Sequence, residues 1–181
     1  MKSTLKTIIN ESKKEIALSF FFVFLIVLID QVSKIYVMNN FYLGESYNVI
    51  KGFFNFTYVR NPGVAFGFGG NFADEVRYIL FRGIPVLACV WLVYLLITSL
   101  KQNKLLATAY TLILGGAIGN LIDRFRLDYV VDFFDFYHRT YHFATFNVAD
   151  SAISVAAALI ILDYFIQLKK GKNSSEVSSQ S

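Results

Sequence analysis

Four long apolar stretches constrain the fold of this chain more than any other feature of its sequence. They cover residues 16–38, 76–100, 105–121 and 148–168. A bilayer core about 30 Å thick needs about 20 mostly apolar residues per spanning helix, and each stretch is close to that length. The composition agrees, because only 17% of the 181 residues are charged, compared with about 25% in soluble domains. We therefore expect an all-α membrane protein in which four transmembrane helices form a bundle.

The apolar stretches also set the domain organisation. The first is too long for a cleaved signal peptide, and it leads into Asp30 and Lys34 instead of a small-residue cleavage site. We therefore expect one membrane-embedded domain over residues 1–168. Residues 169–181 have too little apolar content to fold, and we expect a disordered cytoplasmic tail there.

Lysines gather in three places that an even number of spans brings to one side of the membrane. They are Lys2, Lys6, Lys13, Lys14, Lys101, Lys104, Lys169, Lys170 and Lys172. The positive-inside rule makes that side cytoplasmic, so both termini are expected in the cytoplasm of a multi-pass protein. An excess of positive charge that lies mainly at the chain ends and in one short loop is unlike a nucleic-acid footprint, and we expect no nucleic-acid partner.

The two longer connections, residues 39–75 and 123–147, lie on the opposite, outer side. They are rich in aromatic and β-branched residues with partial alternation, and glycine and proline bound them. This pattern predicts short strands. We expect a small extramembrane β-platform at the headgroup level, where tyrosine side chains are favoured and where the protein meets membrane lipids.

Polar residues gather at the outer ends of the apolar stretches. They are Asp30, Lys34, Asn120, Asp123, Arg124, Asp132, Asn147 and Asp150. A charge near the centre of a spanning helix costs about 2.5–3.5 kcal/mol, so such residues usually face a protein interior. Asp30 and Lys34, four residues apart, are expected to form an ion pair. Arg124 is a candidate to neutralise Asp123 or Asp30. Asp163, near the other end, is expected to be a solvated helix-end charge.

Asp132 and Asp150 are candidates for a catalytic pair. Two carboxylates held close together cannot both ionise easily, so they share one proton. The ionised member takes a proton from water, which attacks a peptide carbonyl, while the protonated member donates to the carbonyl oxygen. This chemistry requires neither a metal ion nor a cofactor. Acids at interfacial helix ends are also common as caps or ion-pair partners, which is the alternative interpretation.

Five short motifs follow one another in the chain in a specific order. They are DQVSK at 30–34, NPGVAF at 61–66, GGAIGNLIDR at 115–124, VVDF at 130–133 and FNVADS at 146–151. In this order and at these helix ends and loops, the motifs resemble those of the lipoprotein signal peptidases (signal peptidase II), aspartyl endopeptidases of the bacterial inner membrane. Each motif alone is weak evidence, but the series covers most of the chain.

The resemblance implies cleavage of diacylglyceryl-modified prolipoproteins immediately before the lipidated cysteine, at a site near the outer leaflet. Asp132 and Asp150 match the family's catalytic aspartates, and the outer strands its β-cradle. A further set of residues matches positions that bind substrate or support the site, namely Asp30, Lys34, Asn61, Gly63, Asn120, Asp123, Arg124, Asn147 and Ala149. The resemblance also implies inhibition by globomycin-type cyclic peptides and a substrate clamp around residues 55–70. We expect a monomer.

Several residues of the sequence admit other interpretations. His138 and His142 are predicted to lie on one strand face, too far apart to chelate a metal. A serine/lysine protease would need a lysine near Ser151 and Ser154, and only Lys34 shares their depth. Asn61 is either a turn residue or a substrate ligand. Three glycines are expected to allow close helix packing, and they are Gly115, Gly116 and Gly119.

Two competing functions differ in class from a peptidase. A proton-coupled carrier should place ionisable groups through the whole bilayer depth, with access from both sides. Here these groups gather at one end, and the two halves of the chain show no inverted repeat. A lipid-modifying enzyme would share the location, but it would not need paired aspartates. The distribution of charge therefore favours the peptidase.

Overall fold

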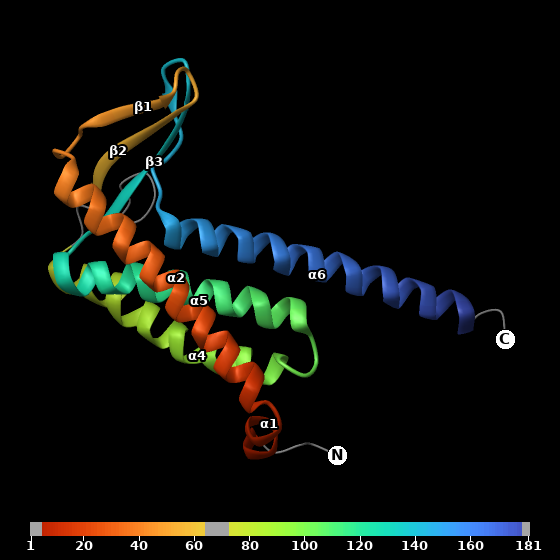
Figure 1. Cartoon of the computed structure of the whole chain (residues 1–181). Coiled ribbons are helices and arrows are strands. Elements are labelled where there is room, and N and C mark those ends of the chain that lie inside the picture. The colour runs from red at the N-terminus through yellow and green to blue at the C-terminus, as the bar shows by residue number, and fades with distance from the viewer. Residues whose placement is uncertain (1–4, 64–72, 179–181) are drawn as a thin grey trace.

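Four helices of the computed structural model, which describes residues 5–63 and 73–178, are long and apolar enough to cross a membrane. These spans are Lys13–Asn40, Glu75–Ser99, Lys104–Leu127 and Val148–Lys170, and they confirm the predicted bundle. In element terms, the spans correspond to α2 (Lys13–Asn40), α4 (Ile84–Ser99) with its preceding turns, α5 (Lys104–Leu127) and α6 (Val148–Ser178). A short helix, α1 (Leu5–Glu11), precedes them (Figure 1).

Helix α5 is the centre of the bundle. Half of its most apolar window is buried inside the protein, compared with 6–11% for the other three spans. It begins at Asn103, whose side chain accepts hydrogen bonds from the backbone N–H groups of Leu105 and Leu106, as an N-cap should. It ends at Asp128, whose φ of 66° is left-handed and stops the helix. The site residues on α5 therefore sit on the most enclosed helix.

Glycines let the neighbouring helices approach α5 closely. A Cβ atom on Gly119 would lie 2.6 Å from an oxygen of Asp30 on α2 and 3.4 Å from the Cβ of Ala149 on α6. A Cβ on Gly116 would overlap the carbonyl oxygen of Ala149. The expectation that these glycines allow close packing is confirmed, and the packing brings α2, α5 and α6 together at one end of the bundle.

A small antiparallel sheet covers that end. Its strands are β1 (Ser46–Ile50), β2 (Phe54–Asn61), β3 (Val130–His138) and β4 (Tyr141–His142), in the order β1-β2-β3-β4. The two predicted strand-forming connections thus pair with each other, through β2 and β3. The register of this pairing shifts between Phe56 and Val59, so that Val59 lies opposite Asp132. Figure 1 shows the sheet at one end of the helices and both chain termini away from it.

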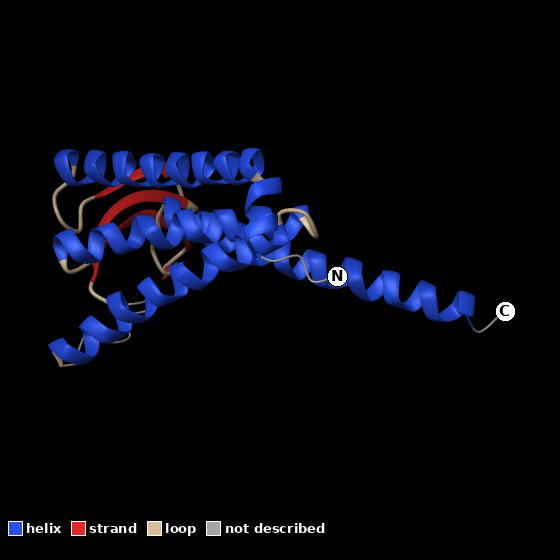
Figure 2. Cartoon of the chain, turned by 90° about the horizontal axis from the view of Figure 1, so that it is seen from below, coloured by secondary structure: helices blue, strands red, loops and turns tan. Residues whose placement is uncertain are grey.

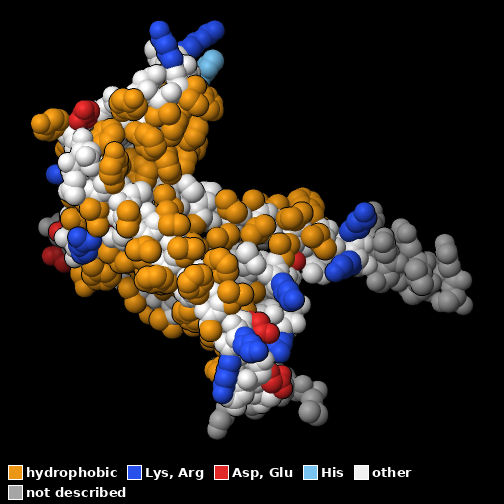
Figure 3. Space-filling model, in the orientation of Figure 1, with side chains coloured by type: hydrophobic (Ala, Val, Ile, Leu, Met, Phe, Trp, Pro, Cys, Tyr) orange, Lys and Arg blue, Asp and Glu red, His pale blue; other side chains and the backbone are white. Residues whose placement is uncertain are grey.

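The helix surfaces are strongly apolar. Exposed large hydrophobic side chains run along α2 and α4, among them Phe21, Phe24, Leu87, Val90 and Trp91. Hydrophobic side chains cover the helices in Figure 3, and many of the lysines and arginines gather near their ends. Such a surface would be unusually apolar for a protein in water, and it agrees with a multi-pass membrane protein.

Three local expectations differ from the structure. Helix α6 continues to Ser178, beyond the predicted end at residue 168, and extends past the other helices (Figure 2). The backbone is therefore helical through most of the predicted disordered tail, because extending an existing helix costs far less than starting one. Asp163 is buried, not solvated, and accepts a hydrogen bond of 2.8 Å from the side chain of Asn103.

The third difference concerns the two histidines. His138 ends β3 and His142 lies in β4, with a turn at Arg139, whose φ is +56°. They therefore do not share one strand face, because the chain reverses between them. His142 instead lies 2.7 Å from the buried carboxylate of Asp135 and stacks on Tyr137. Within residues 5–63 and 73–178, no three His, Cys, Asp or Glu side chains gather as metal ligands would.

Candidate active site

The predicted site residues converge from five elements on one place beneath the sheet. Asp30 and Lys34 come from α2, and Asn61 from the end of β2. The others lie on α5, on β3 or around the start of α6, and they are Asn120, Asp123, Arg124, Asp132, Asn147, Ala149 and Asp150. Gly63 lies two residues after the end of β2. The predicted clamp extends to residue 70, and its part from 64 onward lies outside the described residues.

Lys34 is the buried cation of the site. Its Nζ lies 2.9 Å from Asp30 Oδ2 and 2.9 Å from Asp123 Oδ2, and its side chain is only 1% exposed. It also donates a hydrogen bond of 2.9 Å to Asn120 Oδ1. The predicted pair of Asp30 and Lys34 is confirmed, and Asp123 is the second anion that pairs with Lys34. Removing one partner of such a buried network leaves an uncompensated charge, which costs about 3–5 kcal/mol.

Arg124 was expected to neutralise Asp123 or Asp30, but Lys34 forms the ion pairs with both. The carboxylate with the largest Coulombic effect on Arg124 is Asp150, followed by Asp132 and Asp123. The guanidinium of Arg124 donates a hydrogen bond of 3.2 Å to the backbone oxygen of Gly63, which anchors the end of β2 to α5. Sequence spacing could not decide this, because Lys34 and Arg124 lie at a similar depth on different helices.

Two asparagine amides link the candidate carboxylates. Asn147 Nδ2 donates to Asp132 Oδ1 at 2.6 Å, and Asn120 Nδ2 donates to Asp150 Oδ1 at 2.7 Å. Asn147 Nδ2 also lies 3.2 Å from Asn120 Oδ1, which joins the two halves. Asn120 thus connects the Lys34 network to Asp150, and Asn147 connects both to Asp132. Neutral amides fix the orientation of carboxylates without cancelling their charge.

The start of α6 places Asp150. Asn147 Oδ1 accepts the backbone N–H of Asp150 at 2.9 Å, and Asp150 Oδ2 accepts the backbone N–H of Asn147 at 3.3 Å. This reciprocal pair is a capping box in which Asn147 is the N-cap. Asp30 Oδ1 accepts the next orphan donor, the N–H of Ala149, at 2.9 Å. The position of Asp150 is therefore fixed by the helix end itself.

Asp132 has the environment of a carboxylic acid that keeps its proton. It lies on β3, is 2% exposed, and accepts hydrogen bonds from Asn147 and, at 3.0 Å, from Asn61 Nδ2. Burial, together with the negative charge of Asp150, raises the pKa of Asp132 from 3.8 to about 7, although both amide hydrogen bonds oppose the rise. A carboxyl group with a raised pKa beside a second carboxylate is an arrangement that general acid–base catalysis uses.

Two groups of residues were missed by the sequence analysis. Gln31, inside the DQVSK motif, donates to Asp123 Oδ1 at 2.9 Å and to the backbone oxygen of Gly119 at 3.1 Å. A glutamine in an apolar helix was a signal for this role. The second group lies in the sheet, where Asp135 accepts hydrogen bonds from Asn55, Thr57 and His142. Burial of Asp135 opposes its ionisation, but these donors outweigh that effect and lower its pKa.

Comparison with known proteins gives one consistent family. The sequence model described as signal peptidase (SPase) II matches residues 22–166. A lipoprotein signal peptidase of Shewanella loihica is 48% identical over 166 residues, covering 88% of this chain and 93% of the relative. One of Syntrophus aciditrophicus is 41% identical over 149 residues, covering 82% and 92%.

Solved structures agree with the sequence relatives. A bacterial membrane enzyme determined by the in meso method at 2.3 Å is 32% identical, with a TM-score of 0.75. The match covers 85% of this chain and 91% of that one. A second, determined at 1.9 Å, is 29% identical, with a TM-score of 0.69. The four-helix membrane fold with its small sheet is therefore shared with known membrane enzymes.

Proposed function

The chain belongs to the signal peptidase II family, and from this premise we propose that it is an aspartyl endopeptidase acting on diacylglyceryl-modified prolipoproteins. In this proposal it removes the signal peptide by cleaving before the lipidated cysteine. The name of its relatives, lipoprotein signal peptidase, supports the removal of a signal peptide from lipoproteins. The observation that carries the aspartyl mechanism is the pairing of Asp132 with Asp150 across Asn147. Membership of the family makes the chain a membrane peptidase, and the dyad chemistry is our inference.

In the proposed reaction the dyad holds one proton. Burial and the charge of Asp150 raise the pKa of Asp132 to about 7, so we assign the shared proton of the dyad to Asp132. Ionised Asp150 takes a proton from a water molecule, whose oxygen attacks the scissile carbonyl carbon. Asp132 gives its proton to the carbonyl oxygen, which forms a gem-diol. As the C–N bond breaks, the proton held by Asp150 passes to the leaving amine, and one hydroxyl of the gem-diol returns a proton to Asp132.

The supporting residues have separate tasks in this proposal. Three amides orient the carboxylates, and they are Asn61, Asn120 and Asn147. Asp30, Lys34 and Asp123 form the ion network that locks α2 to α5, while Asp30 also holds the N–H of Ala149 at the start of α6. Arg124, bound to the carbonyl oxygen of Gly63, keeps the end of β2 over the dyad.

An apolar groove beside the sheet suits a lipid-modified substrate. It has a volume of about 950 Å³ and lies between α2 and the strands β1, β2 and β3. Its lining includes Val32, Phe56 and Phe133, and Phe133 directly follows Asp132 in the chain. We propose that acyl chains of the substrate lie along this groove, because burying each CH₂ group stabilises binding by about 0.8 kcal/mol.

We further propose the topology of the enzyme. Lysines flank the end of the bundle away from the sheet, so both termini would be in the cytoplasm and the dyad near the outer leaflet of the bacterial inner membrane. Globomycin-type cyclic peptides are expected to occupy the dyad site, and we expect a monomer.

The deciding experiment is a cleavage assay on purified protein in detergent with diacylglyceryl-modified prolipoprotein. Asp132→Asn and Asp150→Asn should each abolish cleavage while the proteins remain folded. Asp135→Asn is the matched control, because it alters another buried aspartate of the same strand, which bonds to sheet residues, and it should retain cleavage. Full cleavage by either dyad variant would remove that aspartate from the chemistry. No cleavage by the folded parent would favour the carrier interpretation.

A further inference from the structure

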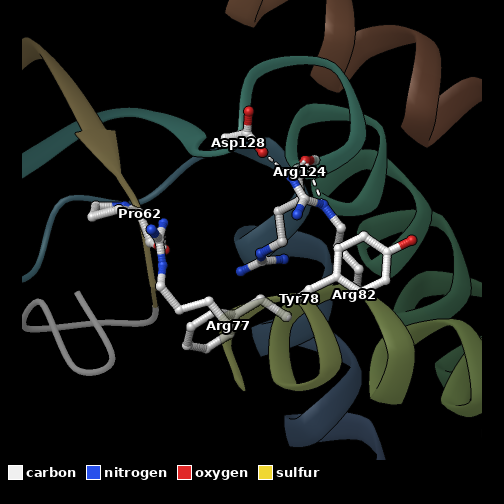
Figure 4. A pocket seen from close by; sticks show the side chains of 7 residues that line it. Pro62, Arg77, Tyr78, Arg82, Arg124 and Asp128 are labelled. Carbon is white, nitrogen blue, oxygen red and sulfur yellow. Dashed lines mark hydrogen bonds and ion pairs between the residues drawn. The ribbon is translucent and has the colours of Figure 1, made fainter. Parts of the chain in front are cut away.

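A groove of about 520 Å³ lies between α2 and α5, at the end of the bundle away from the sheet. It is larger than the pocket in Figure 4, which shares Arg124 with the candidate site. Leu18, Phe22 and Ile26 line the groove from α2. Leu18 and Phe22 are also exposed on the outer surface of the helix. The groove therefore opens toward the hydrocarbon of a surrounding bilayer.

The packing of α2 against α5 explains why the groove forms there. Nearer the sheet the two helices are in close contact, because a Cβ atom on Gly115 would lie 2.9 Å from the Cβ of Ile26. Farther from the sheet, α5 presents Ala107 and Thr111 to the groove. These side chains are small, so they leave space beside the larger residues of α2. The contact at Ile26 closes the inner end of the groove.

Two opposite charges lie at the outer end of the groove. Lys34 on α2 pairs with Asp123, which is 89 positions further along the chain on α5, and the contact at Gly115 has the same spacing. Glu15 and Lys104 are also 89 positions apart, so they lie at one level of the two parallel helices, and both line the groove. Both side chains are exposed, and neither forms an ion pair with any residue of 5–63 or 73–178.

The dimensions of the groove match one acyl chain. Glu15 and Ile26 are eleven residues apart on α2, which is about 16 Å of helix, and half of a bilayer core is about 15 Å. A volume of about 520 Å³ over that length gives a width of about 6 Å. An α-helix is about 10–12 Å wide and does not fit. An extended hydrocarbon chain, about 4–5 Å thick by carbon contact distances, does fit.

We propose that the groove between α2 and α5 holds one acyl chain of phosphatidylethanolamine, a zwitterionic phospholipid. The charges at its outer end complement that headgroup, because Lys104 faces the phosphate and Glu15 accepts charge-assisted hydrogen bonds from the ammonium group. A phospholipid without an amine leaves Glu15 without a partner. The site lies at the opposite end of the bundle from the dyad, so it is independent of the proposed reaction.

The test is native mass spectrometry of the full chain in detergent, given equal amounts of phosphatidylethanolamine and phosphatidylcholine with the same acyl chains. These lipids have the same net charge, so the neighbouring lysines do not distinguish them, whereas only the ethanolamine ammonium donates hydrogen bonds. The parent should retain phosphatidylethanolamine about fivefold more often, the factor that corresponds to about 1 kcal/mol. Glu15→Gln should bring the ratio close to one. Glu11→Gln, which changes an exposed acid outside the groove, should keep it.

A second pair of variants tests the groove itself. Thr108→Leu narrows the groove beside Lys104 and should lower the retention of both lipids by about fivefold, because it displaces CH₂ groups of the acyl chain. Thr98→Leu is the matched control. Its hydroxyl, like that of Thr108, donates to the backbone oxygen four residues earlier, but it lies outside the groove. This control should retain both lipids as the parent does.

Each contrary result overturns the proposal. Equal retention of the two lipids by the parent, or an unchanged ratio in Glu15→Gln, would remove the ethanolamine headgroup from the site. Equal retention by the Thr108 and Thr98 variants would place the lipid outside the groove. Stronger retention of phosphatidylglycerol than of phosphatidylethanolamine by the parent would assign the site to an anionic lipid. If Thr108→Leu fails to fold, the ratios in the parent and in Glu15→Gln decide, because Glu15 is exposed.

Discussion

Asn61 provides the sharpest test of how the dyad is tuned, because it is the donor that reaches Asp132 from the sheet. Its Nδ2 lies 3.0 Å from Asp132 Oδ2. This hydrogen bond stabilises the ionised carboxylate, so it opposes the burial and the Asp150 charge that raise the pKa of Asp132 to about 7. We predict that Asn61→Ala raises the pKa of Asp132 further and moves the alkaline limb of the pH–rate profile upward.

The size of the shift follows from the environment of the hydrogen bond. A hydrogen bond to a charged group contributes about 1.5–3 kcal/mol, and one pKa unit corresponds to about 1.4 kcal/mol. Asn61 is half-buried, so water can replace part of its contribution, and the lower value applies. The active dyad holds one proton and loses it as the pH rises through the pKa of Asp132. Raising that pKa therefore extends activity upward by about one pH unit.

The assay is the pH dependence of kcat/KM for cleavage of a lipidated substrate in detergent, from roughly pH 5 to 9. Asn55→Ala is the matched control, because Asn55 lies on the same strand and donates at 3.1 Å to Asp135 on β3. It should leave the alkaline limb in place. An alkaline limb that stays fixed or moves downward in folded Asn61→Ala would refute the reasoning, and so would an equal shift in the Asn55 variant.

Three further predictions concern stability, measured by thermal unfolding in detergent. Gly119→Ala should destabilise the fold, because its Cβ would meet a carboxylate oxygen of α2 at 2.6 Å and overpacking costs about 1–3 kcal/mol, whereas Gly83→Ala meets nothing within 4 Å and should not. Lys34→Met should cost about 3–5 kcal/mol by leaving two buried carboxylates unpaired, while exposed Lys51→Met should have no effect. Asp132→Asn should be more stable than the parent above pH 7. Because the pKa of Asp132 is raised to about 7 in the folded protein, the proton on Asp132 stabilises the fold fully below about pH 4. This stabilisation, about 4 kcal/mol, is lost as the pH rises through about 7. A parent that matches the Asp132 variant at all pH values, or equal losses within either matched pair, would contradict these three expectations.

The sequence was sufficient for the architecture, because bilayer thickness and backbone hydrogen bonding leave few choices. Four apolar stretches had to become helices, and aromatic, β-branched connections paired as strands once they met at one end. The internal pairing of Asp30 with Lys34 was also predictable, since residues four apart share a helix face. These expectations depend on local spacing, which a sequence displays directly.

Contacts between segments that are distant in the chain were harder to predict from the sequence. The second anion of Lys34 is Asp123, which is 89 positions along the chain, and the partner of Asp163 is Asn103 on another helix. The first contact depends on how closely Gly119 lets α5 approach α2, and the second on how α5 and α6 are aligned, and spacing alone gives neither. The turn at Arg139, which separates the two histidines, requires a left-handed residue that is rarely an arginine. The residue types around Arg139 therefore did not predict this turn.

The charges of the candidate site also explain why its dyad should hold a proton. Lys34 lies between Asp30 and Asp123, so that group carries one net negative charge. Full ionisation of Asp132 and Asp150 would add two more negative charges beside it, with Arg124 as the nearby described cation that remains. Retaining one proton halves the added charge where little water can screen it. The donors to the dyad are neutral amides, which orient the carboxylates and lower the pKa of Asp132 less than burial and the Asp150 charge raise it.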